Sequence, residues 1–302
     1  MFTNKTSLII PTKDRVENLI NLIKKFETLN LSFHETLIID SSNIQNSKKI
    51  YDLTKHKNLR YFKTKPSTSY QRNLGLENIN INKFVMFIDD DVELFGNTFE
   101  KMNECIVKHE DNDEIAGFCF NQISDQKTST FEKLKSSKIL EYLSLYPAKP
   151  GKVAQSGWHS KILNLKNDVL GDWMFTTMCI YKTKEIKKIR FDETFGEYSY
   201  LEDLDFSLNL SNKGKKFFLS SEAKFKHPIN IDRSGYKFGI IEVINRFKIV
   251  KKHNLSKKIF FIVLFFRAFF SFLKSLTFDM KYLKRGLGNF YALFLLIKGS
   301  FR

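Results

Sequence analysis

Short apolar runs that end in polar residues alternate with amphipathic segments along the first third of the chain. Such runs are typical of buried strands, and apolar residues at helical spacing between 16 and 26 predict a surface helix. A Ser/Thr-rich loop at 67–69 opens a second helix. Strands and helices in alternation predict a doubly wound α/β sheet. The first expected strands are 7–10, 36–39, 59–62 and 84–88.

The rest of the chain adds further elements and then changes character. The pattern weakens between 124 and 155. The elements expected after it are a strand at 178–181, a helix at 201–212, short strands at 215–219 and 223–227, and helices at roughly 236–252, 256–275 and 278–298. We therefore expect a globular domain over residues 1–234 and a helical extension over residues 235–302.

Positive charge is concentrated in this extension. The whole chain carries a net charge of +16. From Arg233 to Arg302 there are 15 Lys/Arg and two acids, or +13, so the remainder has 34 basic and 31 acidic residues, or +3. The same segment holds 13 of the 31 phenylalanines. Basic charge mixed with long apolar runs predicts an anionic membrane surface as partner rather than nucleic acid, whose binding surfaces interleave single aromatic residues with charge.

The longest apolar run of the extension lies between 259 and 273, with Arg267 in its middle. A spanning helix needs about 20 largely apolar residues, so this run predicts a helix lying in the membrane plane. The alternative is helices packed on the globular domain. Three widely spaced cysteines without a C-x-x-C pair argue against disulfides and a zinc site. We expect a cytoplasmic protein, peripheral on the inner face of the cell membrane.

Polar residues that can bind a ligand follow the predicted strands. Thr12 and Asp14 follow the first, Asp40 the second, and three aspartates at 89–91 the fourth. Ligands of doubly wound sheets bind at the carboxyl ends of the strands. Adjacent carboxylates repel unless a cation or hydrogen bonds stabilise them, and Mg²⁺ and Mn²⁺ accept carboxylate and phosphate oxygens. The cluster predicts a platform for a metal and a diphosphate; a solvated acidic turn is the alternative.

Five segments together resemble glycosyltransferase family two, which has the GT-A fold. They are 8–15, 37–42, 72–75, 87–91 and 202–205, and the likeness covers about residues 6 to 230. It implies a Rossmann-like mixed sheet flanked by helices, with a nucleotide-binding half at about 1–123 and an acceptor-binding half at 124–234. It also implies metal-dependent, inverting transfer of a sugar from a nucleotide-sugar to an acceptor hydroxyl. The expected acceptor is a glycan or a lipid-linked sugar, in cell-surface polysaccharide or glycolipid synthesis.

The resemblance also implies a role for each matching position. Asp91 is the expected ligand of Mn²⁺ or Mg²⁺, with Asp89 and His227 beside it. Asp203 is the expected general base, and Glu202 is the second choice, because a hydroxyl attacks only as its proton leaves. The expected substrate-binding residues are Pro11, Thr12, Asp14, Asp40, Arg72, Asp89, Asp90 and Trp173. Among them, Asp40 would accept a hydrogen bond from a uracil-like base, and Trp173 would border the acceptor.

Several of these residues also have plainer structural interpretations. Asp14 can cap the following helix, which the sequence favours, and the acids at 202–205 suit a helix start. Arg72 can be a surface helix residue, His227 structural and Trp173 part of the core. Three other functions are a nucleotidyltransferase, an inactive sugar-binding relative and a nucleic-acid-binding protein. The first usually has a glycine-rich phosphate loop after the first strand, which is missing here.

Overall fold

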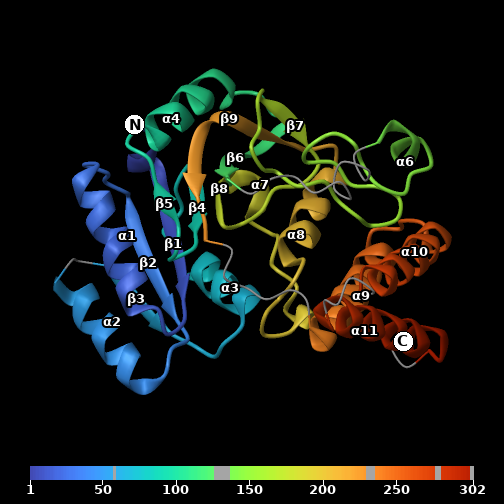
Figure 1. Cartoon of the computed structure of the whole chain (residues 1–302). Coiled ribbons are helices and arrows are strands. Elements are labelled where there is room, and N and C mark those ends of the chain that lie inside the picture. The colour runs from blue at the N-terminus through green and yellow to red at the C-terminus, as the bar shows by residue number, and fades with distance from the viewer. Residues whose placement is uncertain (57–58, 126–136, 229–234, 276–279, 300–302) are drawn as a thin grey trace. The chain divides into compact units, whose positions relative to one another are not determined.

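The computed structural model describes residues 1–56, 59–125, 137–228, 235–275 and 280–299 (Figure 1). The chain forms two compact units. Unit 1 comprises 1–126 and 161–228, and unit 2 comprises 127–160 and 229–302. The expected boundary at residue 234 lies outside the described residues. Among the described residues, 137–160 belong to unit 2, and the division of 1–234 into a nucleotide-binding and an acceptor-binding half stays a prediction.

A mixed sheet forms the centre of unit 1. Within the described residues it has nine strands: β1 (Thr6–Thr12), β2 (Glu35–Asp40), β3 (Arg60–Lys63), β4 (Phe84–Ile88), β5 (Glu93–Leu94), β6 (Ile115–Ile123), β7 (Val169–Gly171), β8 (Met178–Lys182) and β9 (Lys216–Lys226). The strand order is β3-β2-β1-β4-β8-β6-β9-β5, with β7 beside β9. The first four strands are parallel to one another, whereas β8 is antiparallel to β4.

The parallel strands bring the predicted polar residues to one edge. β1 lies between β2 and β4, and its last residue Thr12 pairs with Asp40. Ligands of open α/β sheets bind at such an edge, where the strand order reverses. One expectation for the sheet was wrong. β9 is one continuous strand rather than two, because it pairs along its length with β6 across a register shift after Cys119. β6 itself was not predicted.

Helices connect and cover the strands of unit 1. They are α1 (Val16–Thr28), α2 (Ile44–His56), α3 (Thr68–Asn78), α4 (Thr98–His109), α7 (Thr183–Ile186) and α8 (Glu202–Ser211), with 3₁₀ turns at Phe2–Lys5 and Glu193–Phe195. The buried face of α1 includes Leu19, Ile23 and Phe26, as its spacing predicts. Asp14 does not cap this helix, since Arg15 is the N-cap residue and makes no side-chain capping bond.

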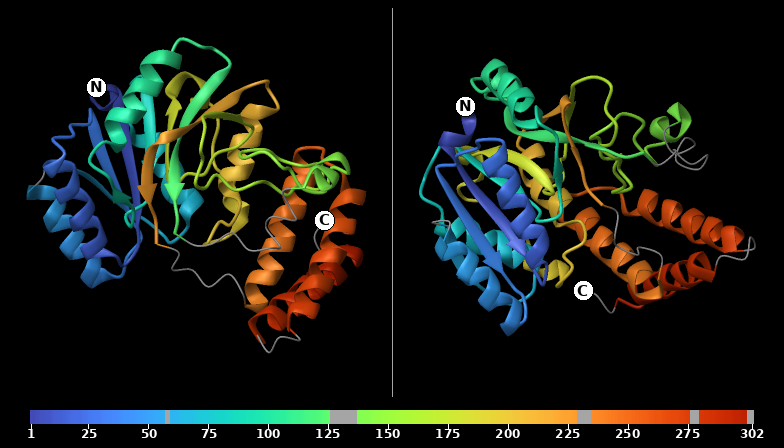
Figure 2. Two further views of the ribbon diagram at one scale, coloured as in Figure 1. Left: turned by 45° about the horizontal axis from the view of Figure 1, so that its top comes forward. Right: turned by 60° about the vertical axis from the view of Figure 1, so that its left-hand side comes forward.

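The described residues of unit 2 form a short helix and three long ones: α6 (Lys138–Tyr142), α9 (Tyr236–Lys252), α10 (Lys257–Ser275) and α11 (Met280–Ile297). The long helices agree with the three predicted stretches, and α11 packs against both others (Figure 2). Glycines allow close approach: a Cβ on Gly239 would lie 2.5 Å from the carbonyl oxygen of Arg285. Trp158, Phe260 and Ala292 belong to the core of this unit. In the described part of the chain no helix is long and apolar enough to cross a membrane.

Candidate functional site

Three potential metal ligands meet beyond the carboxyl end of β4. Oxygens of Asp89 and Asp91 and a ring nitrogen of His227 all lie within 4.8 Å of one another. Asp89 is fixed by its N–H, which donates to the carbonyl of Thr177 at 2.8 Å. His227 is 136 residues from Asp91 in the sequence. It lies beside the aspartates because β5 pairs antiparallel with the end of β9, with Glu93 opposite Lys226. The sheet thus brings the last histidine of unit 1 beside the aspartates.

Asp91 is held in its ionised form by two basic side chains. Nε2 of His227 lies 2.9 Å from Oδ1 of Asp91, and Nη1 of Arg15 lies 2.6 Å from Oδ2. Burial opposes ionisation, but the hydrogen bond to His227 and the charges of both partners outweigh it and lower the pKa of Asp91. The same contact raises the pKa of His227 against its own burial. A carboxylate that stays ionised is available to a cation.

Asp90 points away from this cluster and into the protein. Its carboxylate accepts hydrogen bonds from Thr12 Oγ1 at 2.6 Å and from Arg15 Nη1 at 3.1 Å. Burial raises the pKa of Asp90 to about 6, against these bonds. Thr12 and Asp90, which were both predicted to bind the nucleotide-sugar, are therefore hydrogen-bonded to each other. Arg15 links Asp90 to Asp91, and the sequence assigned it no role; its place directly after Asp14, just beyond the end of β1, was the available signal.

Arg72 is buried and joins the acidic cluster to the start of α8. Its Nη1 donates to Glu202 and its Nη2 to Asp89 at 3.2 Å, so the surface-residue interpretation is wrong. Gly75, one turn later, permits the close packing of α3 on β1, because a Cβ there would lie 2.6 Å from the side chain of Ile9. The segment 72–75 thus positions a guanidinium between two acidic sites that are 113 residues apart in the sequence (202 − 89).

The start of α8 has an unusual backbone. Ser199 and Leu201 have φ angles of 47° and 76°, a region that non-glycine residues rarely adopt and that often marks functional sites. Glu202 is buried here, and burial together with the charge of Asp203 raises its pKa to about 8, despite Arg72. Asp203 is only half-buried, and its Oδ1 accepts the N–H of Leu204 at 2.7 Å. Of the two acids, Asp203 suits a base better, since Glu202 is buried and already paired with Arg72, whereas Asp203 is half-exposed.

Asp40 is fully buried at the end of β2 and already accepts several hydrogen bonds. Its donors are the N–H of Ser42 at 2.7 Å, the hydroxyl of Ser47 at 2.6 Å and the hydroxyl of Tyr61 at 2.8 Å. These bonds outweigh burial and lower the pKa of Asp40, while burial and Asp40 raise that of Tyr61 to about 12. A nucleobase would reach this carboxylate only if one donor moved, so the direct contact stays a prediction.

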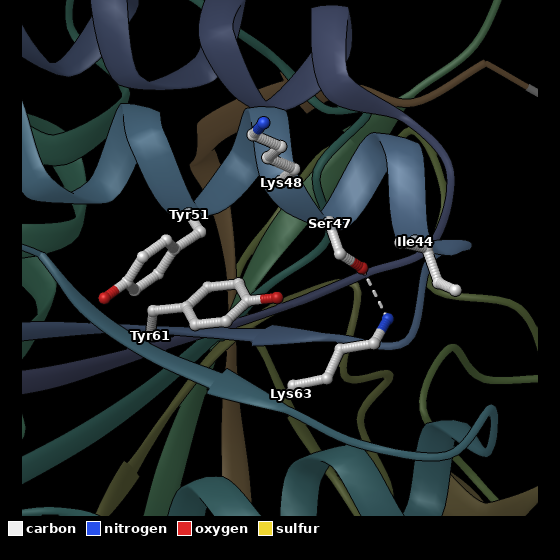
Figure 3. A pocket seen from close by; sticks show the side chains of 6 residues that line it. All are labelled: Ile44, Ser47, Lys48, Tyr51, Tyr61 and Lys63. Carbon is white, nitrogen blue, oxygen red and sulfur yellow. Dashed lines mark hydrogen bonds between the residues drawn. The ribbon is translucent and has the colours of Figure 1, made fainter.

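A cavity of about 400 Å³ opens next to Asp40. At its edge Lys63 Nζ donates a hydrogen bond to Ser47 Oγ at 2.5 Å, and Tyr61 lies beside them (Figure 3). Its lining residues are Ile44, Ser47, Lys48 and Tyr51 from α2 and Tyr61 and Lys63 from β3. Two tyrosine rings and two lysines form a surface on which an aromatic, anionic ligand can pack.

The remaining predicted residues occupy different environments. Asp14, with a φ of 56°, accepts hydrogen bonds from the backbone of Asn43 at 2.9 Å and the side chain of Asn46 at 3.0 Å, and these lower its pKa. Pro11 is buried within β1. Trp173 is only 5% exposed, which favours the core interpretation over stacking on an acceptor.

Solved structures of other proteins share the fold of this chain. No protein-family model matches the chain, and neither does any curated protein sequence. Among solved structures, the mannosyltransferase PcManGT from Pyrobaculum calidifontis, in complex with GDP-Man and Mn²⁺, matches with a TM-score of 0.56 and 11% identity over 98% of this chain and 87% of its own. S. aureus TarS with UDP-GlcNAc matches with a TM-score of 0.50 and 16% identity, covering 82% of this chain and 71% of that one.

The chain has the GT-A-like fold of these glycosyltransferases. The predicted fold class, a mixed α/β sheet flanked by helices with a C-terminal helical extension, is confirmed. At identities of 11% and 16%, the structural similarity shows the fold alone. The function has to be argued from the residues of the site.

Proposed function

We propose that this protein is a metal-dependent glycosyltransferase that moves a sugar from a nucleoside diphosphate to an acceptor hydroxyl. The observation that carries the proposal is the cluster of Asp89, Asp91 and His227 at the carboxyl edge of the parallel strands. A solved protein of the same fold holds GDP-Man with Mn²⁺, and another holds UDP-GlcNAc. The cluster lies at the edge where such a sheet binds its ligand.

The donor atoms of the cluster fit Mn²⁺ or Mg²⁺. Two carboxylates and an imidazole make a mostly hard set, which Mn²⁺ accepts readily and Mg²⁺ accepts through its oxygens. Asp91 is the proposed direct ligand because His227 and Arg15 keep it ionised. Asp89 and His227 complete the set, with His227 in its neutral form, because a protonated imidazole has no lone pair for a metal. When bound, the ion would neutralise charge that develops on the leaving diphosphate.

The nucleoside is proposed to bind along Pro11 to Asp14 and beside Asp40. The cavity between α2 and β3 supports this location, since its tyrosines offer flat apolar surface and Lys48 and Lys63 offer positive charge. Asp40 positions Ser47 and Tyr61 at the wall of this cavity. Arg72 contributes by holding Asp89 in place through its hydrogen bond.

Asp203 is the proposed general base for the acceptor hydroxyl. It is next to Glu202 in the sequence, and Arg72 donates hydrogen bonds to both Glu202 and Asp89. The proposed base is therefore held at a fixed position relative to the proposed metal site. A single in-line attack opposite the diphosphate would invert the anomeric carbon. The proposed acceptor is a glycan or lipid-linked sugar of cell-surface polysaccharide or glycolipid, used at the inner face of the cell membrane. A sugar-nucleotide-binding protein without transferase activity is the alternative, and turnover separates the two.

We expect Mn²⁺ or Mg²⁺ to strengthen nucleoside-diphosphate binding, and Asp91→Ala to remove that effect. The phosphate charge then loses the cation that bridges it to the protein, which should weaken binding by at least about tenfold. Calorimetric titration of UDP and GDP, with metal and with chelator, measures this. Asp113→Ala is the matched control, because Asp113 is an exposed aspartate of the same unit paired with Lys184. Equal affinity with and without metal in the unaltered protein would exclude the metal site.

A screen of nucleotide-sugars tests the reaction itself. We expect metal-stimulated release of nucleoside diphosphate from one donor, and a product whose anomeric configuration is opposite to that of the donor. Nuclear magnetic resonance of the product reports the configuration. Retention would contradict the single-displacement mechanism, and donor binding without any turnover would favour the non-catalytic alternative.

A further inference from the structure

Helix α10 exposes a continuous face of large apolar side chains. Its opposite face is buried in the core of unit 2 through Phe260, Val263, Leu264 and Ala268. The exposed residues follow helical spacing along more than two turns and are each between 42% and 55% exposed: Ile262, Phe265, Phe266, Phe269, Phe270 and Phe272. Contiguous exposed apolar patches of this kind mark interaction sites for proteins or membranes.

No charge interrupts this face among its described side chains. We had read Arg267 as a break in the apolar run, but its guanidinium turns inward and donates to Glu242 at 2.8 Å. Glu242 also accepts from Arg285 of α11 at 2.7 Å, so the charge of the run is neutralised inside the unit. The side chain of Arg267 is only 13% exposed. The apolar residues of α10 therefore present one uninterrupted surface.

Helix α11 has a second apolar face of the same kind. Leu287, Phe290, Tyr291, Phe294 and Ile297 are exposed, whereas Gly286, Asn289 and Ala292 are buried against its neighbours. Exposed lysines lie at the start of α10, at 257 and 258, and at both ends of α11, at 281, 284 and 298. Apolar residues between terminal lysines are the arrangement of a helix that lies in a membrane interface.

The exposed charge of these helices is entirely positive. Glu242 is the sole acid in 235–275 and 280–299, and it is buried. Further exposed lysines lie on α9 at 237, 251 and 252. A second copy of the chain would bring like charges together, which opposes self-association through these faces. An anionic lipid surface offers the complementary charge and an apolar layer beneath it.

We propose that the apolar faces of α10 and α11 insert into the interfacial layer of an anionic lipid bilayer, with the surrounding lysines at the headgroups. Lysine attraction brings the protein to the surface, and burial of the phenylalanines retains it. The binding needs neither metal nor nucleotide, so it stands apart from the proposed sugar transfer. It predicts an in-plane contact, since no described helix is long and apolar enough to cross the bilayer.

The test uses the full chain and sedimentation with lipid vesicles. We expect binding to vesicles of phosphatidylcholine with phosphatidylglycerol, weaker binding to pure phosphatidylcholine, and partial retention at high salt, because salt screens charge but not apolar insertion. Phe265→Gln with Phe269→Gln should weaken binding by roughly tenfold or more, whereas leucine at both positions should preserve it. Lys257→Gln with Lys258→Gln should weaken it by about fivefold for each lysine, only on anionic vesicles.

Matched substitutions on unit 1 provide the control. Ile81→Gln with Val107→Gln removes two exposed apolar side chains outside these helices and should leave vesicle binding unchanged. Circular dichroism and nucleotide binding check that each variant is folded. The proposal is overturned if the unaltered chain does not bind anionic vesicles. It is also overturned if the glutamine pair at 265 and 269 changes vesicle binding no more than the control pair at 81 and 107. It is also overturned if Phe265→Gln with Phe269→Gln converts an oligomer to a monomer without changing vesicle binding, since the faces would then join copies of the chain.

Discussion

Replacement of Asp203 by asparagine is expected to lower sugar transfer by roughly 10²–10⁴-fold, the usual contribution of a general base. Donor binding should change little, because the cluster of Asp89, Asp91 and His227 is untouched. The amide oxygen can still accept the N–H of Leu204, so the start of α8 should keep its structure. The loss should therefore appear in kcat rather than in the affinity for the nucleotide-sugar.

Glu202→Gln is the matched comparison for this experiment. Burial raises the pKa of Glu202, so an uncharged amide of the same shape is a close substitute, and its oxygen can still accept from Arg72. We expect this variant to transfer sugar within a few-fold of the unaltered protein. If Glu202→Gln abolishes transfer while Asp203→Asn retains it, the base is Glu202. If neither variant loses activity, the proposed mechanism at α8 is wrong.

Glu242→Gln should destabilise unit 2 by about 3–5 kcal/mol, the usual effect of breaking a buried ion pair. Glu242 accepts hydrogen bonds from Arg267 and Arg285, and Arg246 is buried nearby with its Nη1 on the carbonyl of Gly157. The variant removes the carboxylate that partly offsets the charges of these three guanidinium groups. Glu222→Gln is the control, because its side chain is 62% exposed and pairs only with exposed Lys224 among the described residues.

Acid should unfold unit 2 through the same residue. Burial opposes ionisation, but the arginines outweigh it and lower the pKa of Glu242 to about 2, against an ordinary value of 4.5. Its contribution to stability is thus complete above pH 4.5 and is lost as the pH falls through 2. A difference of that size corresponds to about 3 kcal/mol. Glu242→Gln should lack this part of the pH dependence.

Fluorescence can follow unit 2 alone. The chain has two tryptophans, Trp158 in unit 2 and Trp173 in unit 1. In a Trp173→Phe background, urea unfolding monitored at Trp158 reports the helical unit, and comparison at neutral and acid pH gives both the destabilisation and its pH dependence. Identical unfolding of Glu242→Gln and the background protein at neutral pH would show that the buried pairs do not stabilise the unit.

Local sequence patterns determined the elements that hold the site. The strands 7–10, 36–39 and 84–88 and the three C-terminal helices were predicted close to their observed bounds, because apolar periodicity reports which face of an element is buried. Acids at the ends of those strands indicated a ligand-binding edge, because the carboxyl ends of parallel strands lie at the same edge of a sheet. Strand β6 and the full length of β9 escaped prediction, because their pairing depends on partners far along the chain.

The tertiary structure alone decided which side chains act together. Asp91 meets a histidine 136 residues away, and Arg72 meets Glu202 at a separation of 130. Arg267 looked like an interruption of an apolar run until Glu242 was seen to neutralise it inside the helices. Periodicity records whether a residue faces the core but not what it meets there. Ionisation depends on burial and on the nearest charges, which are set only when the distant elements pack.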